Sequence, residues 1–428
     1  MKPEINIGII GLGKVGCGAL RALLENKSEI ERKIGSRMEV VKIADLDITS
    51  ERPVEFDKSL LTTDAGEILD NPDIDIVAEL IGGVHPAKEF ILRALRNGKH
   101  VVSANKELIA KEGSEIFDEV TKRGLDFYFE GSVGGGIPII RPLKTCLAAN
   151  KIQEVMGIVN GTTNYILTKM AREGRDFAEV LSEAQKAGYA EADPTSDVEG
   201  HDAKYKIAIL ASIAFTSRVN VDDIYCEGIT EVGQRDIEYA RELGYTVKLL
   251  AIAKRSGKKM QIRVHPTLIP SSHPLASVND VYNAIYVRGD FVQDVMFYGR
   301  GAGSLPTGSA VAGDILDIAR NINLGANGRL PCTCFDRWPV QKMDEVVTRY
   351  YIRMLVADRP GVLASIASVF GDHGVSIASV VQKDQHGDKA EIVMVTHQVA
   401  ERNFRRAIEL ISKLPVIAEI CNWIRVEE

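Results

Sequence analysis

The sequence lacks long apolar runs and clusters of basic residues. No stretch approaches the roughly 20 apolar residues that a membrane-spanning helix needs. The first residues, MKPEINIGIIGLG, lead directly into an apolar segment and a glycine-rich turn rather than a leader pattern. The net charge is −7 without a Lys or Arg run, which argues against a nucleic-acid surface. We therefore expect a cytoplasmic protein without nucleic-acid or membrane partners.

Cysteine is also scarce, with six residues in 428. The six are far apart for a disulfide scaffold, so we expect reduced thiols: Cys17, Cys146, Cys226, Cys332, Cys334 and Cys421. Cys332 and Cys334 lack a second ligand pair at zinc spacing, so we predict no metal site there.

The length and the pattern of the chain indicate several domains. Over residues 1–130, short apolar runs alternate with helical patterns, which predicts a doubly wound parallel sheet. The expected strands are Ile5–Ile10, Met38–Ala44, Ile74–Leu80, His100–Ser103 and Leu125–Phe129. A helix within residues 306–325 is expected to return and pack on this sheet.

The remaining chain divides into three parts. Residues 131–305 mix the two patterns, with helices expected at Tyr165–Glu173, Phe177–Ala187 and Asp202–Phe215 and strands at Val247–Ala253 and Gln261–Val264. Residues 324–339 are rich in Gly, Asn and Pro, which is typical of a linker, and we expect the linker to span residues 326–347. Residues 348–428 follow a βαββαβ order, which predicts one sheet covered by two helices.

A glycine-rich turn follows the first strand and opens a helix. In this context Gly11, Gly13 and Gly16 favour dinucleotide binding over a purely structural turn, with Leu12 and Val15 in the same loop. Asp45 ends the second strand, where a carboxylate could accept from the ribose hydroxyls of NAD. Arg52 could instead meet the 2′-phosphate of NADP, and both residues could lie in a solvated loop. The choice between NAD and NADP stays open.

Two lysines and an aspartate are candidates for reactive groups. Asp202 and Lys206 are four residues apart in a predicted helix and share one face. An exposed ion pair is the alternative interpretation of that spacing. Lys106 follows the strand His100–Ser103, and the carboxyl ends of parallel strands border the ligand crevice. An ordinary solvated lysine is the alternative there.

Five motifs over residues 5–330 resemble the homoserine dehydrogenase family. They are GLGKVG, SANK, EGSVGGGIP, NGTTNYIL and GYAEADPTSDVEGHDAKYK. The resemblance implies a Rossmann domain and a mixed α/β domain that binds substrate and forms the dimer. It also implies reversible hydride transfer between L-homoserine and L-aspartate 4-semialdehyde with NAD or NADP, in threonine and methionine biosynthesis.

The resemblance also implies roles for individual residues. Lys206 matches the catalytic lysine, Lys106 its partner beside the cofactor, and Asp202 a residue that orients Lys206. The other implied substrate contacts are Glu191, which would hold the amino group, Asp197, Thr162 and Thr163; Gly188 and Gly303 would approach the cofactor.

A monovalent cation such as Na+ is implied as well. Its ligands would be the carboxyl or carbonyl of Glu130 and the carbonyls of Val133, Gly135 and Ile137. One position departs from the family: Ala44 stands where many members have a basic residue. This departure weakens the expectation of an NADP preference.

The C-terminal segment Val356-Ala-Asp-Arg-Pro-Gly-Val-Leu363 resembles the signature of ACT domains, which bind amino-acid effectors. By resemblance we expect L-threonine as the effector, near Asp358, Gly361, Val362 and Ile377. A dimerisation module without ligand is the alternative. Either role predicts a homodimer or homotetramer.

Three other functions are less well supported. They are a non-catalytic amino-acid sensor, a thioester-forming aldehyde dehydrogenase, and a dehydrogenase for another amino acid. None of the six cysteines has a recognisable nucleophile setting, which argues against the thioester enzyme.

Overall fold

The computed structural model describes residues 1–386 and 388–428. Its packing divides the chain into two compact units, which are described separately. The first unit contains residues 1–155, 205–221 and 282–338, and the second contains residues 156–204, 222–281 and 339–428. In the described part of the chain, no helix combines the length and the apolar character needed to cross a bilayer.

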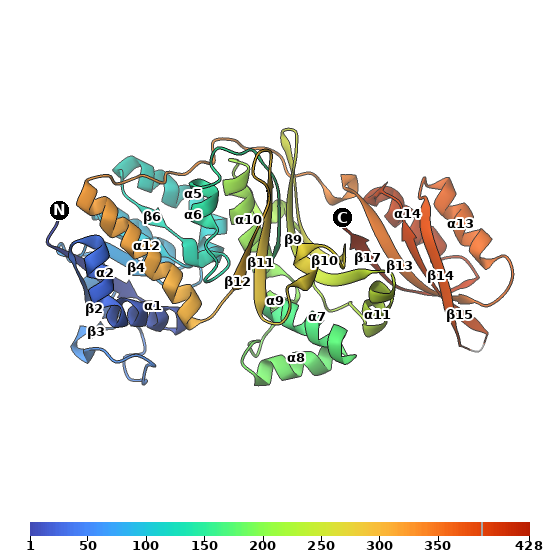
Figure 1. Cartoon of the computed structure of the whole chain (residues 1–428), viewed down its shortest axis with the longest axis horizontal. Coiled ribbons are helices and arrows are strands. Elements are labelled where there is room, and N and C mark those ends of the chain that lie inside the picture. Colours follow the sequence, from blue (N-terminus) through green and yellow to red (C-terminus); the bar gives the residue numbers. More distant parts are fainter. Residues whose placement is uncertain (387) are drawn as a thin grey trace. The chain divides into compact units, whose positions relative to one another are not determined.

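The first unit contains a six-stranded parallel sheet (Figure 1). In spatial order its strands are β3 (Leu61–Thr62), β2 (Arg37–Ala44), β1 (Glu4–Ile10), β4 (Ile76–Glu79), β5 (His100–Ser103) and β6 (Phe127–Tyr128). This is the strand order of a Rossmann sheet, and the order reverses between β1 and β4. The predicted doubly wound fold is confirmed, with β3 as an additional strand.

Helices accompany this sheet within the first unit. They are α1 (Lys14–Glu25), α2 (Lys27–Ile34), α3 (Gly66–Leu69), α4 (Ala87–Arg96), α5 (Lys106–Arg123), α6 (Ile140–Lys144) and α12 (Ser304–Leu324). The predicted return of residues 306–325 is confirmed, because α12 lies along α1 in Figure 1 and buries Ile315 and Ile318 in the same core as β1. An antiparallel hairpin of β11 (Tyr282–Gly289) and β12 (Gln293–Arg300) was not predicted.

Two elements continue from one unit into the other along the chain. They are β7 (Ile152–Ile158) and α10 (His201–Ala214). The second unit then contains α7 (Gly161–Glu173), α8 (Phe177–Lys186), α9 (Thr195–Val198), α11 (Gln234–Glu242) and the strands β8 (Tyr225–Cys226), β9 (Tyr245–Ser256) and β10 (Lys259–Pro270). β9 and β10 pair along their whole length in antiparallel register.

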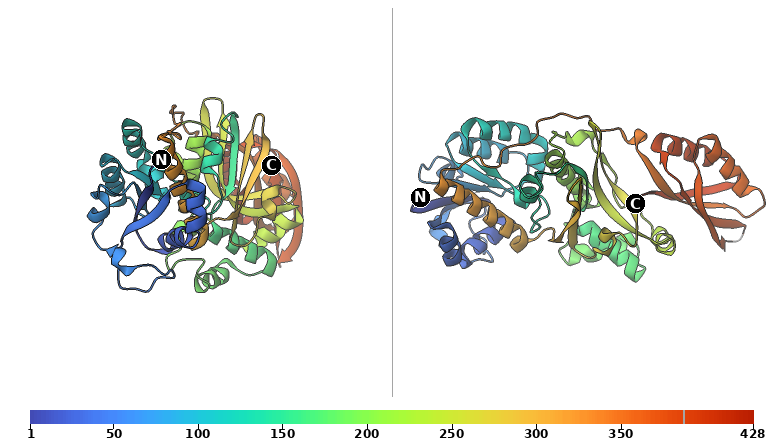
Figure 2. Two further views of the ribbon diagram at one scale, coloured as in Figure 1. Left: turned by 60° about the vertical axis from the view of Figure 1, so that its left-hand side comes forward. Right: turned by 45° about the horizontal axis from the view of Figure 1, so that its top comes forward.

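The predicted βαββαβ order of the C-terminal segment is confirmed, with β16 (Val399–Ala400) as a short addition. Its elements are β13 (Val347–Ala357), α13 (Val362–Asp372), β14 (Ile377–His386), β15 (Lys389–Thr396), α14 (Glu401–Ile411) and β17 (Ile417–Val426). Both helices lie on one face of the sheet (Figure 2). There Ile366 and Phe370 of α13 and Phe404 of α14 pack against Tyr350 and Ile352.

This C-terminal sheet is continuous with the rest of the second unit. β17 pairs with β13 on one side and, in parallel, with β10 on the other, where Arg425 lies opposite Thr267. The sequence pattern had predicted a separate module behind a linker. The last strand of the chain instead extends the sheet of β9 and β10.

Candidate functional site

The glycine-rich loop has the geometry of a dinucleotide turn. Gly11 has φ +101°, and a Cβ there would lie 2.8 Å from the Leu80 carbonyl. A Cβ on Gly16 would lie 2.1 Å from the Gly11 oxygen, whereas one on Gly13 would meet nothing within 4 Å. Gly11 and Gly16 therefore permit the tight turn and close helix packing, and Gly13 leaves open space where a pyrophosphate can approach the backbone.

Asp45 ties this loop to the segment after β2. Its Oδ2 accepts from the Leu12 N–H at 2.5 Å, and its Oδ1 lies 3.4 Å from a guanidinium nitrogen of Arg52. Arg52 also donates to the Asp47 carbonyl at 2.5 Å. The Leu12 side chain is buried in the core, so only its backbone faces the loop. A carboxylate and a guanidinium thus lie side by side at the end of β2.

The start of α12 lies beside the same loop. Ser304 Oγ donates to the Lys14 carbonyl at 2.6 Å, and the preceding Gly303 has φ +124°. Val15, in the first turn of α1, is half-buried. Gly303, almost 290 residues later in the chain, therefore lies next to the glycine-rich turn.

A buried network positions Lys106 at the end of β5. Asn105 caps α5 by accepting from the Leu108 N–H at 3.1 Å, and it donates to the Gly83 carbonyl at 2.6 Å. Ser103 Oγ donates to Glu79 Oε2 at 2.8 Å. Burial raises the pKa of Glu79. These polar contacts between β4 and β5 fix the first residue of α5. Ser103 and Asn105 belong to the motif SANK, but no role had been predicted for them or for Glu79.

Asp202 and Lys206 are both buried on α10, with exposed fractions of 5% and 8%. The exposed ion pair considered as an alternative is therefore excluded, because neither side chain is on the surface. Lys204, between them in sequence, is half-buried.

Asn160 connects the acidic residues of this region, a role that was not predicted from the sequence. Its Nδ2 donates to Asp197 Oδ1 at 2.7 Å and to Asp202 Oδ2 at 2.9 Å. Its Oδ1 caps α7 by accepting from the Thr163 N–H at 2.9 Å and from Thr163 Oγ1 at 3.0 Å. The side-chain amide of Asn160 thus donates to two carboxylates and caps the start of α7. Two signals in the sequence pointed to this residue: it opens the motif NGTTNYIL, and it is an N-cap residue type before Gly-Thr-Thr.

Of the other expected substrate residues, Thr162 and Thr163 lie in the first turn of α7, and Glu191 lies in the segment before α9. Thr162 Oγ1 donates to the Tyr189 carbonyl at 2.8 Å, which links α7 to the segment that begins at Gly188, where φ is +75°. Glu191 is exposed. A carboxylate accessible to solvent is available to meet a charged amino group.

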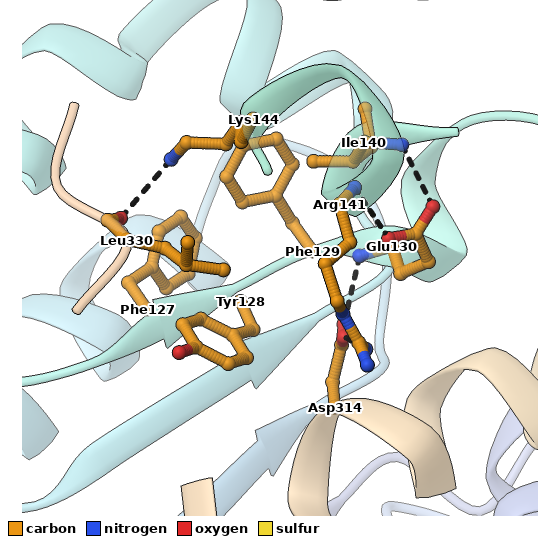
Figure 3. Close-up of a pocket in the computed structure, with 9 residues that line it drawn as sticks. All are labelled: Phe127, Tyr128, Phe129, Glu130, Ile140, Arg141, Lys144, Asp314 and Leu330. Atoms are coloured by element: carbon orange, nitrogen blue, oxygen red, sulfur yellow. Dashed lines mark hydrogen bonds and ion pairs between the residues drawn. The ribbon is translucent and has the colours of Figure 1, made fainter. Parts of the chain in front are cut away.

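The Glu130 carboxyl accepts hydrogen bonds from the backbone of the following segment (Figure 3). It accepts from the N–H groups of Ile139 at 2.5 Å, Ile140 at 2.8 Å and Arg141 at 2.8 Å. The Glu130 N–H in turn donates to Asp314 at 2.7 Å. Burial, together with the nearby Glu130 charge, raises the pKa of Asp314 to about 7, although Arg141 opposes the shift.

The other predicted cation ligands are main-chain carbonyls of the loop that follows Glu130. Gly134 and Gly135 have φ values of +73° and +56°, so the loop from Glu130 to Ile137 turns sharply, and Val133 and Ile137 are buried. Such oxygens suit a hard cation. Across residues 1–386 and 388–428, no group of three or more His, Cys, Asp or Glu side chains is placed to hold a metal ion.

The expected effector residues do not all lie together. Asp358 and Gly361, with φ +91°, form the turn from β13 into α13, where Val362 is buried. Ile377 pairs with Thr396, whereas Ala357 pairs with Lys389 at the other end of β15. Seven residues of strand separate these positions by roughly 23 Å. One small ligand cannot contact both ends of a single domain.

Three family models match the chain. The model described as homoserine dehydrogenase matches residues 138–316, and the model of its NAD binding domain matches residues 11–130. An ACT domain model matches residues 350–416. These matches confirm both resemblances found in the sequence.

Known proteins agree over the full length. The homoserine dehydrogenase of Synechocystis sp. is 47% identical over 431 residues, which cover 99% of each chain. The structure of a homoserine dehydrogenase from Thiobacillus denitrificans has a TM-score of 0.92 at 43% identity and covers 99% of this chain and 98% of that one. A hyperthermophilic archaeal homoserine dehydrogenase in complex with NADPH has a TM-score of 0.62 at 27% identity, over 74% of this chain and 97% of that one. The chain therefore belongs to the homoserine dehydrogenase family and is an NAD(P)-dependent oxidoreductase with a C-terminal ACT domain.

Proposed function

We propose that Lys206 is the acid–base residue for the interconversion of L-homoserine and L-aspartate 4-semialdehyde, with Lys106 beside the cofactor. The observation that carries this proposal is the burial of Lys206 one helical turn after Asp202, whose carboxylate is held by Asn160. A buried cation needs a compensating charge, and an acid four residues earlier on the same helix face can supply it.

The nicotinamide, when bound, supplies or accepts the hydride. In the reducing direction Lys206 as ammonium donates a proton to the carbonyl oxygen, and in the oxidising direction neutral Lys206 accepts it from the hydroxyl. Lys106 stabilises negative charge that develops on the same oxygen. Asp202 orients Lys206 through their shared helix face.

We assign the homoserine contacts to the segment around α9 and the first turn of α7. Glu191 binds the amino group, and Asp197 belongs to the same loop, where Asn160 holds its carboxylate. Thr162 and Thr163 contribute through the start of α7, which Asn160 caps. The hydrogen bonds of Asn160 support the assignment, because they order the acidic loop before a ligand binds.

For the cofactor, we propose that Gly11, Leu12, Gly13, Val15 and Gly16 cradle the pyrophosphate, with Gly188 and Gly303 approaching through their backbones. Asp45 and Arg52 select between the dinucleotides. Asp45 suits the ribose hydroxyls of NAD, and Arg52 suits the 2′-phosphate of NADP. The archaeal relative in complex with NADPH supports NADP, whereas Ala44 weakens the case for an NADP preference and leaves NAD open.

We further propose a structural monovalent cation such as Na+ at the Glu130 loop. The carbonyls of Glu130, Val133, Gly135 and Ile137 would hold it, while the Glu130 carboxyl stays bound to three backbone N–H groups. The cation would fix the loop and take no part in proton transfer.

The ACT domain would bind L-threonine at Asp358, Gly361 and Val362. Ile377 can join that site only from a second copy of the domain, because it lies at the opposite end of the sheet. A homodimer or homotetramer is supported by β12, where Met296 and Tyr298 are exposed, as is Phe291 in the preceding turn. A cytoplasmic location stays a prediction.

One assay tests the activity, the cofactor and the effector. NAD(P)H formation is followed with L-homoserine, with NAD and NADP in separate reactions, and with and without L-threonine. We expect turnover and inhibition by L-threonine. Folded protein that binds L-threonine but forms no NAD(P)H would favour the sensor function, and an unchanged rate across a threonine titration would exclude that effector.

A further inference from the structure

A buried arginine in the last strand connects the ACT domain to the segment after β8. Arg425 is fully buried, with an exposed fraction of 0%. Inside its own domain it donates to Glu401 through Nε at 2.8 Å and Nη2 at 2.6 Å. Its Nη1 reaches out of the domain to Glu227 Oε2 at 2.8 Å, and Nη2 reaches the Tyr225 hydroxyl at 3.1 Å.

Glu227 is held in place from two sides. Besides Arg425, it accepts from the Tyr225 hydroxyl at 2.6 Å, and its backbone N–H donates to the Val264 carbonyl of β10 at 2.9 Å. Charge-assisted hydrogen bonds of this kind are stronger and more directional than neutral ones. The conformation of residues 226–229 therefore depends on a side chain from the C-terminal strand.

Residues 226–229 pack directly on the segment that precedes α10. Cys226 Sγ donates to the Glu199 carbonyl at 3.3 Å, and the Ile229 N–H donates to the Val198 carbonyl at 2.8 Å. A Cβ on Gly228 would lie 2.2 Å from the Val198 oxygen, so the two backbones are in close contact. On the other side, a Cβ on Gly200 would lie 3.2 Å from Cys226 Sγ.

Val198 to Gly200 lie between the two acids that Asn160 holds, Asp197 and Asp202. A continuous set of contacts thus runs from Arg425 through Glu227 and residues 226–229 to the loop assigned to homoserine. We propose that Glu227, held by Arg425, is a positioning residue for homoserine binding, so that the ACT domain is a structural part of the substrate site. This inference rests on the proposed assignment of that loop to homoserine.

A second ion pair between the same strand and the same sheet provides a matched comparison. Glu427, two residues after Arg425, pairs with Arg263 of β10 and with Lys254 of β9 at 2.6 Å. Glu427 and Arg263 are buried as well. None of the hydrogen bonds of Glu427 reaches residues 226–229. Loss of this pair should lower stability without changing the substrate loop.

The experiment compares Glu227→Ala, Glu227→Gln and Glu427→Gln in the full-length enzyme. For each we would measure kcat, the KM for L-homoserine, the KM for the nicotinamide cofactor and Tm. We expect Glu227→Ala to raise the homoserine KM at least about 5-fold, with kcat and the cofactor KM unchanged, because the substrate and the transition state lose the same binding energy. Glu227→Gln should raise it less, since the amide oxygen can still accept from Arg425 or Tyr225. Glu427→Gln should lower Tm and leave every kinetic constant unchanged.

The proposal is overturned if Glu227→Ala lowers Tm as Glu427→Gln does while the homoserine KM stays at the wild-type value. Gly228→Ala gives an independent measurement, because it leaves the ion pair intact and pushes on Val198 directly; it should raise the homoserine KM as well. An unchanged KM in Gly228→Ala would also contradict the proposal. Absence of homoserine turnover in the wild-type enzyme would instead contradict the proposed function, so the two failures are distinguishable.

Discussion

At the scale of single residues, Lys206 gives the most direct test of the chemistry. Lys206→Ala should lower kcat by about 10²- to 10⁴-fold, the usual contribution of general acid–base catalysis. Lys204→Ala is the matched control, because Lys204 lies two residues away on the same helix and faces another direction. Steady-state kinetics and circular dichroism of both variants check the prediction. Near-normal kcat in folded Lys206→Ala would refute the assignment.

Asn160 should prove as important as the charged residues. Asn160→Asp keeps the shape of the side chain but removes the amide that donates to Asp197 and Asp202, and it adds a third acid beside them. We expect a loss of about 1–3 kcal/mol in the free energy of unfolding and a large loss of kcat/KM. Urea unfolding and homoserine kinetics measure the two effects. Asn160→Ala, which adds no charge, should be less harmful, and equal effects of both variants would show that repulsion is unimportant.

The pair Asp45 and Arg52 should set the cofactor preference. Arg52→Ala should lower kcat/KM for NADP relative to NAD, by roughly tenfold or more if the guanidinium meets the 2′-phosphate. Asp45→Asn should move the preference in the opposite direction, because it removes the negative charge near that phosphate. Parallel kinetics with the two cofactors test both variants. A ratio that neither variant changes would mean that both residues only hold the loop after β2.

Residues whose role follows from local spacing were predicted from the sequence. Residues whose role depends on contacts with distant parts of the chain were not. Gly11, Gly13 and Gly16 are recognisable because their spacing reflects the turn itself. Asn160 and Glu79 are not, because their importance comes from residues that are distant in the chain, such as Asp202 and Ser103. The Glu130 carboxyl was predicted as a possible cation ligand, and the fold shows in addition that it accepts from three backbone N–H groups of the next segment.

At the scale of elements, patterns with a clear periodicity were predicted well. The strands β4 and β15 contain short buried apolar runs, Ile76–Ala78 and Ile392–Val395, which indicate buried strands. The helix α5 was not predicted, because its apolar residues are sparse and Gly113 interrupts them. The strand β12 was also missed, since it is half-exposed along its whole length and has no buried run.

The packing of α12 on α1 gives a test of element contacts. A Cβ on Gly308 would lie 2.3 Å from the Gly18 carbonyl carbon, so Gly308→Ala should destabilise the protein by about 1–3 kcal/mol through overpacking. Gly313→Ala lies in the same helix, and its Cβ would meet only an Arg141 nitrogen at 4.0 Å. That control should stabilise the helix by about 0.5–1 kcal/mol. Thermal unfolding measures both, and equal shifts of Tm would contradict the close contact.

At the scale of the whole molecule, ion pairs of Arg425, Glu427 and Arg353 attach the C-terminal domain to the rest of the second unit. Arg425 pairs with Glu227, Glu427 pairs with Arg263, and Arg353 of β13 donates to Asp236 of α11 at 2.6 Å. β17 adds hydrogen bonds to the edge of β10. The linker-like composition of residues 326–347 gave no sign of these contacts, because they depend on strand pairing between distant parts of the chain.

The chain should therefore not tolerate removal of its ACT domain. A protein that ends at Trp338 would leave Asp236 and Arg263 buried without their partners and expose the edge of β10. Loss of one partner of a buried ion pair typically costs about 3–5 kcal/mol, and an unpaired strand edge promotes aggregation. We expect the truncated protein to be insoluble or to melt well below the full-length enzyme, with weak homoserine binding. Calorimetry and light scattering of both proteins test this. A soluble truncated enzyme with the wild-type homoserine KM would mean that the ACT domain is an independent module after all, and that the contacts of Glu227 do not reach the substrate.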